Sequence, residues 1–574
     1  MTAPVIRWRG GPGAGKSSAL LEYVRSEITA GAMLDDFTLM TFSRSQAADL
    51  INRLHHSIFP DASLDTLRSR CATIDAMALR ACRDAGLIGD SREVIIQPGD
   101  QKKRGIFTEF MNAHDLEYNP AIGTENYEEG LLHAEIPIGN QLLTLNAYLS
   151  STGRPPEDWQ MASATLGLPI LPYAWPIIDL LHAWKDYKAR LGVYEHADYV
   201  ALALRHALSP PSPILIIDEY QDVSPVQDAL IRHWIDHPDT SQAYVAGDED
   251  QSIYGFRGCD PSLLQGIPAI DHGAQGGSTR PTSYRCPEDV MKTAELILNH
   301  PANVAPCNRR GIVRHVGPTA AEDLAAQIEE AIRYIYDKGQ KGPIFILCRF
   351  KKHVRSLANV ISTAGIPCSS IRPHRVKRWE KICIGSRSDG SEPITINPWE
   401  LTQAIKRYLE GCDLDLFPKA EAEVLIEALL SGRQQQAALM DLKIKSKTRE
   451  IRRGDLFQWF NGIDGPGIFH RLNLPKWMIK QIQACIRRDR RRGYSLSPHG
   501  IKIDTIHAPK GLEASVVMLH TGYLSGRMNG LTDPARAAEE RRIYFTGATR
   551  AADALLLLDY GKGPRCPFLI GVTG

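Results

Sequence analysis

Six short apolar runs constrain the fold of this 574-residue chain more than any other feature. They read TLMTFS, ILIIDEY, AYVAGDED, IFILCRF, SVVMLH and ALLLLDY, and turn signals and helical patterns lie between them. Continuous Val, Ile and Leu runs of this length are typical of strands buried on both faces of a parallel sheet. Together with helical segments such as Ser18–Ala30 and Val354–Ala364, they predict a doubly wound α/β fold.

The runs form two groups, and a long stretch of different composition interrupts each group. A single hydrophobic core stops growing near about 250–300 residues, so several domains are expected. We predict two RecA-like lobes of the P-loop NTPase type, each carrying an inserted, mostly helical subdomain. The predicted ranges are 1–88 and 212–280 for the first lobe, 89–211 for its insertion, 281–372 and 500–574 for the second lobe, and 373–499 for its basic insertion.

Composition places the chain among soluble globular proteins, since 43% of its residues are hydrophobic and 23% are charged. The formal net charge is +1, so any surface that binds an anion must be local. The eleven cysteines form no CxxC pair, which favours a reducing compartment and argues against a zinc site. With no signal-peptide pattern and no apolar run of about 18 residues, we expect a cytoplasmic protein of a bacterium or of a phage-infected cell.

A glycine-rich segment near the start of the sequence fits the phosphate-loop pattern G-x-x-x-x-G-K-[ST]. An apolar run precedes it and a helical pattern follows it, which is the context that this motif requires. Lys16 is expected to reach the β- and γ-phosphates of a nucleotide, and the Ser17 hydroxyl to hold Mg²⁺. The residues expected to contact the nucleotide here are Gly10, Gly11, Pro12, Gly13, Ala14, Gly15, Lys16, Ser17 and Ser18.

The run ILIIDEYQD supplies two carboxylates at the end of a predicted strand. Ligands bind at the carboxyl ends of strands in open α/β sheets. We expect Asp218 to complete the Mg²⁺ shell and Glu219 to orient and deprotonate an attacking water molecule.

Further blocks extend the pattern and carry a resemblance to a known family. DEYQDVSPVQ (218–227) and GDEDQSIYGFRG (247–258) resemble signature blocks of superfamily 1 DNA helicases of the UvrD/Rep/PcrA type. TFSRSQAADL, SYRCP, TIHAPKGLEASVV and EERRIYFTGATRA follow in the order of that family.

The resemblance implies a motor in which ATP binds between two lobes and single-stranded DNA crosses them. In this reading Gln251 senses the γ-phosphate, and Arg285 and Arg550 reach the phosphates from the second lobe. Glu513 matches an acid that contacts the ribose, and Tyr284 matches a tyrosine that stacks on the base.

The same resemblance marks a path for single-stranded DNA. Bases are expected to stack on Phe42, Tyr254 and Phe256, and Phe256 stands where the family usually has Trp. Weaker candidates for contacts with the DNA backbone are Thr41, Arg257, Thr505 and His507.

Two basic stretches lie in the second predicted insertion, KIKSKTREIRR (443–453) and IRRDRRRG (486–493). One interpretation is a solvated helix face. The other is a surface that grips duplex DNA ahead of the motor, through Arg487, Arg488, Arg490, Arg491 and Arg492.

Besides Phe256, the sequence departs from the family in three further respects. Ser18 replaces an arginine that often contacts the base, and a glutamine that reads adenine upstream of the loop has no counterpart here, which predicts loose selectivity between ATP and GTP. Asp75 stands where the family often has histidine, and we expect it to turn away from DNA or to pair with an arginine.

The predicted function is an ATP-dependent DNA helicase that moves 3′ to 5′ on single-stranded DNA and acts at junctions with duplex in repair or replication. Its motor unit is expected to be a monomer. The alternative is a single-strand translocase, or a nucleotide-gated DNA-binding subunit, that strips proteins or serves a partner and unwinds little by itself.

Overall fold

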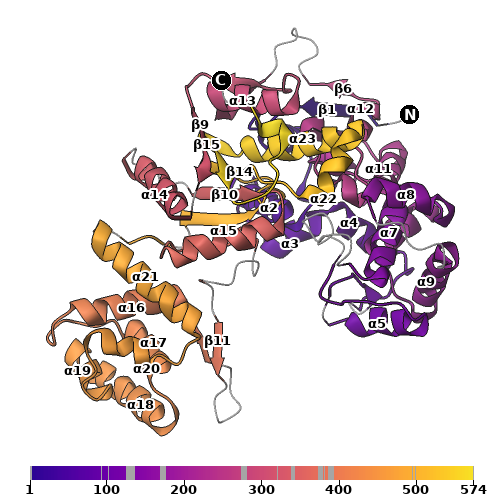
Figure 1. Ribbon diagram of the computed structural model, residues 1–574. Helices are drawn as coiled ribbons and strands as arrows, with labels where there is room; N and C mark the ends of the chain where they lie inside the picture. Colours follow the sequence, from indigo (N-terminus) through magenta and orange to yellow (C-terminus); the bar gives the residue numbers. More distant parts are fainter. Residues whose placement is uncertain are drawn as a thin grey trace.

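The computed structural model describes residues 3–91, 94–100, 102–123, 136–168, 176–272, 281–319, 321–337, 343–372, 379, 382–385, 394–493, 495–497 and 500–572. Two parallel β-sheets organise the chain, as the apolar runs predicted (Figure 1). All six runs form strands in them.

The first sheet has six parallel strands in the order β3-β2-β4-β5-β1-β6. Its strands are β1 (Val5–Arg9), β2 (Phe37–Thr41), β3 (Cys71–Thr73), β4 (Ile214–Ile217), β5 (Gln242–Gly247) and β6 (Ile270–Asp271). The helices around it are α1 (Lys16–Thr29), α2 (Arg44–Ser57), α3 (Leu64–Arg70), α4 (Ile74–Asp84), α10 (His196–Arg205), α11 (Pro225–Asp236) and α12 (Ser262–Gly266).

Strand β4 shows why an unbroken apolar run is needed in this sheet. Ile214 and Ile216 pack into a cluster with residues of α1 and α2, such as Leu20. Leu215 and Ile217 pack into a second cluster with residues of α4, α10 and α11. Successive side chains of a strand point to opposite faces, so helices on both faces require apolar residues at every position.

The second sheet has five parallel strands in the order β13-β10-β14-β15-β9. Its strands are β9 (Ile312–Thr319), β10 (Ile344–Cys348), β13 (Ile501–Thr505), β14 (Ala514–His520) and β15 (Ala551–Tyr560). Helices α13 (Glu288–Leu298) and α23 (Pro534–Ala548) share one core with it, and α14 (Ala321–Asp337) and α15 (Lys351–Thr363) share the other. Beside it lie the short helix α22 (Ser525–Met528) and the parallel pair β7 (Thr282–Pro287) and β8 (Ala305–Cys307).

Two groups of helices have cores of their own, and Figure 1 shows them at the lower right and the lower left. The first group comprises α5 (Arg104–Ala113), α7 (Ile138–Thr152), α8 (Trp159–Leu166) and α9 (Ile177–Leu191). The second comprises α16 (Pro398–Glu410), α17 (Lys419–Leu429), α18 (Gly432–Thr448), α19 (Arg453–Trp459), α20 (Ile468–Arg471) and α21 (Lys476–Arg492), with the antiparallel pair β11 (Ile382–Gly385) and β12 (Ile394–Ile396) beside them. Within the described ranges, no helix is long and apolar enough to cross a membrane.

Candidate nucleotide and DNA site

The phosphate-loop segment joins the carboxyl end of β1 to the start of α1. Gly13 and Gly15 have φ angles of +71° and +83°, in the left-handed region that favours glycine. Gly15 is the residue that caps α1, so the loop leads directly into the helix N-terminus, where the helix dipole favours an anion. Lys16 Nζ folds back onto the loop and donates hydrogen bonds to the carbonyl oxygens of Gly10 at 2.8 Å and Gly11 at 3.4 Å.

Strand β7 and the segment before β8 cover this loop from the other side. The N–H of Gly11 donates to the Asn303 carbonyl at 3.1 Å, and the N–H of Tyr284 donates to the Gly13 carbonyl at 2.8 Å. A Cβ atom on Gly13 would lie 2.6 Å from Ser283 Oγ, so only glycine fits. The loop therefore contacts parts of the chain on both sides of it.

Ser17 and Asp218, the two residues predicted to hold Mg²⁺, lie in contact with each other. The Ser17 hydroxyl donates to Asp218 Oδ2 at 2.6 Å, and Asp218 directly follows β4. Burial, and then the neighbouring Glu219 carboxylate, raise the pKa of Asp218 to about 6. A hydroxyl and a carboxylate are hard oxygen donors of the kind that Mg²⁺ prefers, so these two side chains fit the ion. Among the residues that the structure describes, no group of three or more His, Cys, Asp or Glu side chains forms a separate metal site.

Glu219 has an unusual backbone and an ionised side chain. Its φ angle of +59° is in the left-handed region, which costs a non-glycine residue about 1–3 kcal/mol and is common at functional sites. Burial alone would raise the pKa of Glu219, but the charges of Lys510 and Lys16 outweigh it and hold the pKa below its ordinary value. The carboxylate is thus in the form that can accept a proton from water.

The structure brings Gln251 and Arg550 together across the two sheets. Gln251 follows β5 of the first sheet, and Arg550 lies between α23 and β15 of the second. Arg550 Nη2 donates to Gln251 Oε1 at 2.7 Å, and Gln251 Nε2 donates to Asp248 Oδ2 at 2.6 Å. Burial, and then the charge of Arg285, lower the pKa of Arg550 to about 9, so this buried guanidinium remains a cation at neutral pH.

Arg285, Tyr284 and Glu513 also lie where the part of the chain that carries the second sheet meets the part that carries the first. Arg285 Nε donates to Glu513 Oε2 at 2.7 Å, so these two predicted ligands of the nucleotide are paired with each other. Tyr284 is 84% exposed, and its Cε2 atom lies 3.3 Å from the position that a Cβ atom of Gly15 would occupy. Its ring therefore stands at the edge of the phosphate loop with most of its surface accessible.

Lys510 is a residue of this site that the sequence analysis missed. It is buried, forms an ion pair with Asp222, and its Nζ donates to the main-chain oxygen of Gln251 at 2.7 Å. Burial raises the pKa of Asp222 to about 7, although the charge of Lys510 acts in the opposite direction. The block TIHAPKGLEASVV contains this lysine, so the signal was present, but the block was used only for Thr505, His507 and Glu513.

The three predicted DNA-stacking residues lie together with two of the candidates for backbone contacts, in a group that we call the aromatic cluster: Phe42, Tyr254, Phe256, His507 and Arg257. The rings of Phe42 and Tyr254 are 4.7 Å apart, and the Arg257 guanidinium lies 5.6–5.8 Å from the three Phe and Tyr rings. Phe42 and Phe256 are half-buried, whereas Tyr254 is only 7% exposed. A base can reach Tyr254 only if its neighbours move.

Three of the four candidates for contacts with the DNA backbone are less accessible. Thr41, Thr505 and His507 are buried, and the Thr41 hydroxyl donates to Gln46 Oε1 at 3.3 Å. Asp75 accepts a hydrogen bond from Gln227 Nε2 at 2.7 Å, so its partner is an amide and not the arginine that we considered.

Three arginines of the basic stretch 486–493 in the second helical group pair with acidic side chains. Arg488 is buried beside Glu329 and Asp489, at 3.4 Å and 3.2 Å. Arg492 and Arg490 also pair with acids, at 2.5 Å and 3.0 Å. The interpretation of 486–493 as a continuous phosphate-binding face is therefore wrong for Arg488, whose charge is internal. Arg487 and Arg491 are exposed.

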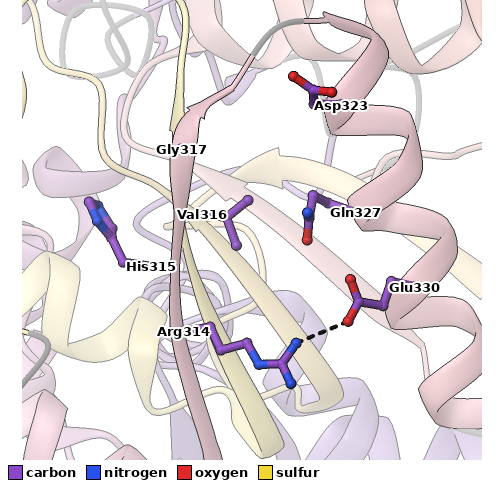
Figure 2. Close-up of a pocket in the computed structure, with 7 residues that line it drawn as sticks. All are labelled: Arg314, His315, Val316, Gly317, Asp323, Gln327 and Glu330. Atoms are coloured by element: carbon purple, nitrogen blue, oxygen red, sulfur yellow. Dashed lines mark hydrogen bonds and ion pairs between the residues drawn. The ribbon is translucent and has the colours of Figure 1, made fainter.

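A hollow of about 380 Å³ lies elsewhere, between the edge strand β9 and α14 (Figure 2). An ion pair of 2.9 Å joins Arg314 to Glu330 across its wall. Its lining residues are Arg314, His315, Val316, Gly317, Asp323, Gln327 and Glu330, and the sequence predicted none of them for the site.

The fold and the site together define a class: a P-loop α/β protein whose phosphate loop, on one parallel sheet, faces residues carried by a second parallel sheet. A model of the UvrD/REP helicase N-terminal domain matches residues 176–268. With the signature blocks in family order, this match makes the chain similar to superfamily 1 helicases of the UvrD/Rep/PcrA type.

Curated relatives show the same similarity. The chain is 32% identical over 75% of its length to the putative ATP-dependent DNA helicase YjcD of Bacillus subtilis, of which it covers 62%. It is 24% identical over 60% of its length to the ATP-dependent DNA helicase UvrD2 of Mycobacterium tuberculosis, covering 46% of that protein. To the RecBCD enzyme subunit RecB of Mycolicibacterium smegmatis it is 23% identical over 62% of its length, covering 39%. The chain thus spans about two fifths to three fifths of the length of these relatives.

Proposed function

We propose that this chain is an ATP-dependent DNA helicase that moves 3′ to 5′ on single-stranded DNA, with a monomeric motor unit. The observation that supports the proposal is the hydrogen bond from Arg550 of the second sheet to Gln251 of the first, the residue proposed to sense the γ-phosphate. Such an arginine stabilises the charge that develops during phosphoryl transfer.

The chemistry follows from the residues around the loop. Lys16 and the N-terminus of α1 bind the phosphates, and Glu219 accepts a proton from the water that attacks the γ-phosphorus. The bond to the β-γ bridging oxygen breaks, which yields ADP and phosphate, while Arg285 and Arg550 neutralise the developing charge. Ser17 and Asp218 would hold Mg²⁺, which supplies further neutralisation of the phosphates.

Movement is proposed to come from the two-sheet construction of this site. Arg550 and Lys510 belong to the second sheet, and their partner Gln251 belongs to the first. Lys510 also lies 5.3 Å from the ring of Tyr254 in the aromatic cluster. A change in the cleft that shifts Lys510 is therefore transmitted to the proposed DNA path.

The domain division belongs to the same proposal. The two sheets would be motor lobes, built from residues 1–88 with 212–280 and from 281–372 with 500–574. The helical groups within 89–211 and 373–499 would be their insertions. The strand order supports this, since every strand of the six-stranded sheet falls within the first pair of ranges.

An unwinding assay on duplexes with a 3′ or a 5′ single-stranded tail tests the proposal. We expect ATP-dependent strand separation from the 3′ tail only. Lys16→Ala, which removes the cation that binds the phosphates, is the control and should separate no strands. Unwinding from the 5′ tail alone would overturn the proposed direction.

A second candidate function is a single-strand translocase, or a nucleotide-gated subunit, that strips proteins or serves a partner and unwinds little. The buried ion pair of Arg488 and the surface ion pairs of Arg490 and Arg492 favour it, because they reduce the positive charge left for duplex DNA. ATP hydrolysis stimulated by single-stranded DNA, without strand separation from either tail, would support this candidate over the first.

A further inference from the structure

The first turn of α23, in the second half of the chain, contacts the last turn of α8, in the first helical group. Arg536 Nη2 donates hydrogen bonds to the carbonyl oxygens of Ala164 and of Thr165, the latter at 3.1 Å. The last four carbonyls of a helix lack N–H partners within it, and the helix dipole makes this end favourable for a cation. The Arg536 guanidinium thus caps α8 from a position 372 residues beyond Ala164.

Two glycines leave room for this guanidinium. A Cβ atom on Gly167, the residue that follows α8, would lie 3.0 Å from Arg536 Nη1. A Cβ atom on Gly530, just before α23, would lie 3.2 Å from the same nitrogen. Both distances are shorter than an ordinary van der Waals contact, so the Arg536 side chain is closely enclosed between the two helix ends.

Two further side chains of α23 continue the contact with the first half of the chain. Glu539 and Arg542 follow Arg536 by three and six residues, and residues three apart on a helix are neighbours on its surface. The Glu539 carboxylate lies so close to Gly255 that a Cβ atom there would collide with it. Arg542 Nε donates to the main-chain oxygen of Ser252 at 3.0 Å. One face of α23 therefore lies along the first half, from α8 to the residues after β5.

Arg536 and Arg550 lie toward opposite ends of this face. Arg536 is about 18 Å from Ala548, the last residue of α23, at about 1.5 Å per residue. Arg550 follows shortly after, with its hydrogen bond to Gln251. Contacts near one end alone would let the helix pivot about them, and a contact at the distant end opposes that rotation. Because both contacts are present in the same structure, loss of the Arg536 contact disfavours the arrangement in which Arg550 reaches Gln251.

We propose that Arg536 is a positioning residue for ATP hydrolysis, which attaches α23 to α8 and so holds Arg550 against Gln251. This inference rests on the proposed function, which assigns the hydrolytic centre to those two residues. Arg536 acts at a distance from the phosphate loop, through the helix that leads to Arg550. The first helical group thereby takes part in hydrolysis, because α8 is the support against which α23 is oriented.

ATP hydrolysis stimulated by single-stranded DNA and ADP binding, both measured on the full chain, separate positioning from nucleotide binding. Arg536→Ala should lower kcat about tenfold, the effect of losing one hydrogen bond to a charged group. ADP affinity should stay the same, because the phosphate loop is intact. Arg536→Lys keeps a cation for the carbonyls of α8 and should restore much of the rate. An unchanged kcat in Arg536→Ala would overturn the inference.

A double-mutant cycle tests whether Arg536 acts through Arg550. In the Arg550→Ala background, Arg536→Ala should change the residual single-turnover rate less than twofold, because no guanidinium remains to be positioned. A loss of rate by the same factor in both backgrounds would show that Arg536 acts independently of Arg550, and the inference would be wrong.

Arg154→Ala is the matched control, because Arg154 pairs with Asp158 inside the first helical group at 3.1 Å. It should hydrolyse ATP like the wild type, and thermal melting shows that each variant is folded. A loss of ADP affinity as large as the loss of kcat in Arg536→Ala would also contradict a positioning role. If the wild type hydrolysed no ATP in the presence of DNA, the proposed function itself would fail.

Discussion

Lys510 Nζ donates a hydrogen bond to the main-chain oxygen of Gln251 at 2.7 Å, and so joins the loop after β13 of the second sheet to the turn after β5 of the first. The side chain of the same Gln251 accepts a hydrogen bond from Arg550. One residue of the first sheet is thus held by two cations of the second, and the proposed hydrolytic centre is complete only when the two sheets are together.

Replacing Lys510 with methionine should change the pH dependence of ATP hydrolysis. Lys510 is the largest influence that keeps the pKa of Glu219 low, so without it burial dominates and that pKa rises. A base with a raised pKa is protonated at higher pH, so the acidic limb of the kcat profile should move upward. If the pKa rises by about one, the rate at a given pH on that limb falls about tenfold. Lys502→Met, on strand β13, is the control; a lower rate with an unmoved limb would contradict the role.

Arg550→Ala should abolish hydrolysis without abolishing nucleotide binding. An arginine that stabilises the transferring phosphoryl group is worth about 10³-fold or more in rate. Single-turnover hydrolysis and ADP binding, measured side by side, separate the two effects. The control is Arg541→Ala. Arg541 lies on α23 and donates to the Ile297 carbonyl rather than to Gln251, so this variant should hydrolyse ATP normally. A tenfold or smaller effect of Arg550→Ala would remove it from the proposed mechanism.

Phe256→Ala should weaken binding of single-stranded DNA. Stacking of one base on an aromatic ring is worth about 1–3 kcal/mol, or roughly five- to 150-fold in affinity. Phe256→Trp offers a larger ring and should bind at least as tightly as the wild type. Fluorescence anisotropy with a labelled oligonucleotide measures both, and thermal melting shows that each variant is folded. Equal affinity of all three proteins would exclude Phe256 from the DNA path.

Arg488→Ala should destabilise the fold, whereas Arg487→Ala should not. Arg488 is buried beside Glu329 and Asp489, so its removal leaves buried carboxylates with less compensation and costs about 3 kcal/mol. Arg487 is exposed, and changes at such positions stay within about 0.5 kcal/mol. Urea unfolding measures both.

If the double variant Arg487→Ala/Arg491→Ala lost unwinding but kept DNA-stimulated ATPase, these two residues would form the remaining contact with duplex.

The Asp250→Asn variant should gain stability relative to the wild-type protein as the pH rises from 5 to 8. Burial, and then Asp248, raise the pKa of Asp250 to about 7, while an unfolded Asp titrates near 3.9. Between these values the folded state binds more protons than the unfolded state, so wild-type stability falls as pH rises through this window. Asparagine does not titrate. A difference in melting temperature that is constant with pH would contradict the raised pKa; the exposed Asp65→Asn is the control.

The strands were predictable because β4, β10 and β14 are buried on both faces and therefore have continuous apolar sequences. The meeting of Ser17 with Asp218 was predictable for a related reason, since both follow strands of one parallel sheet at the same edge. The pairing of Arg488 with Glu329 was not, because 159 positions separate them and a basic run has the same appearance whether its partners are phosphates or buried carboxylates. Lys510 was missed because a single cation has no spacing pattern; only its neighbours in space indicate its role.

The phosphate loop is hydrogen-bonded on two sides, with Gly10 bound to Gly247 of the first sheet and Gly11 to Asn303 before β8. A loop attached in this way cannot lose its shape without loosening both halves. The melting of one half should therefore bring down the other in a single cooperative transition. By mass action, a nucleotide bound to the loop would raise the temperature of that common transition, so one small ligand would protect both halves of the proposed motor against heat.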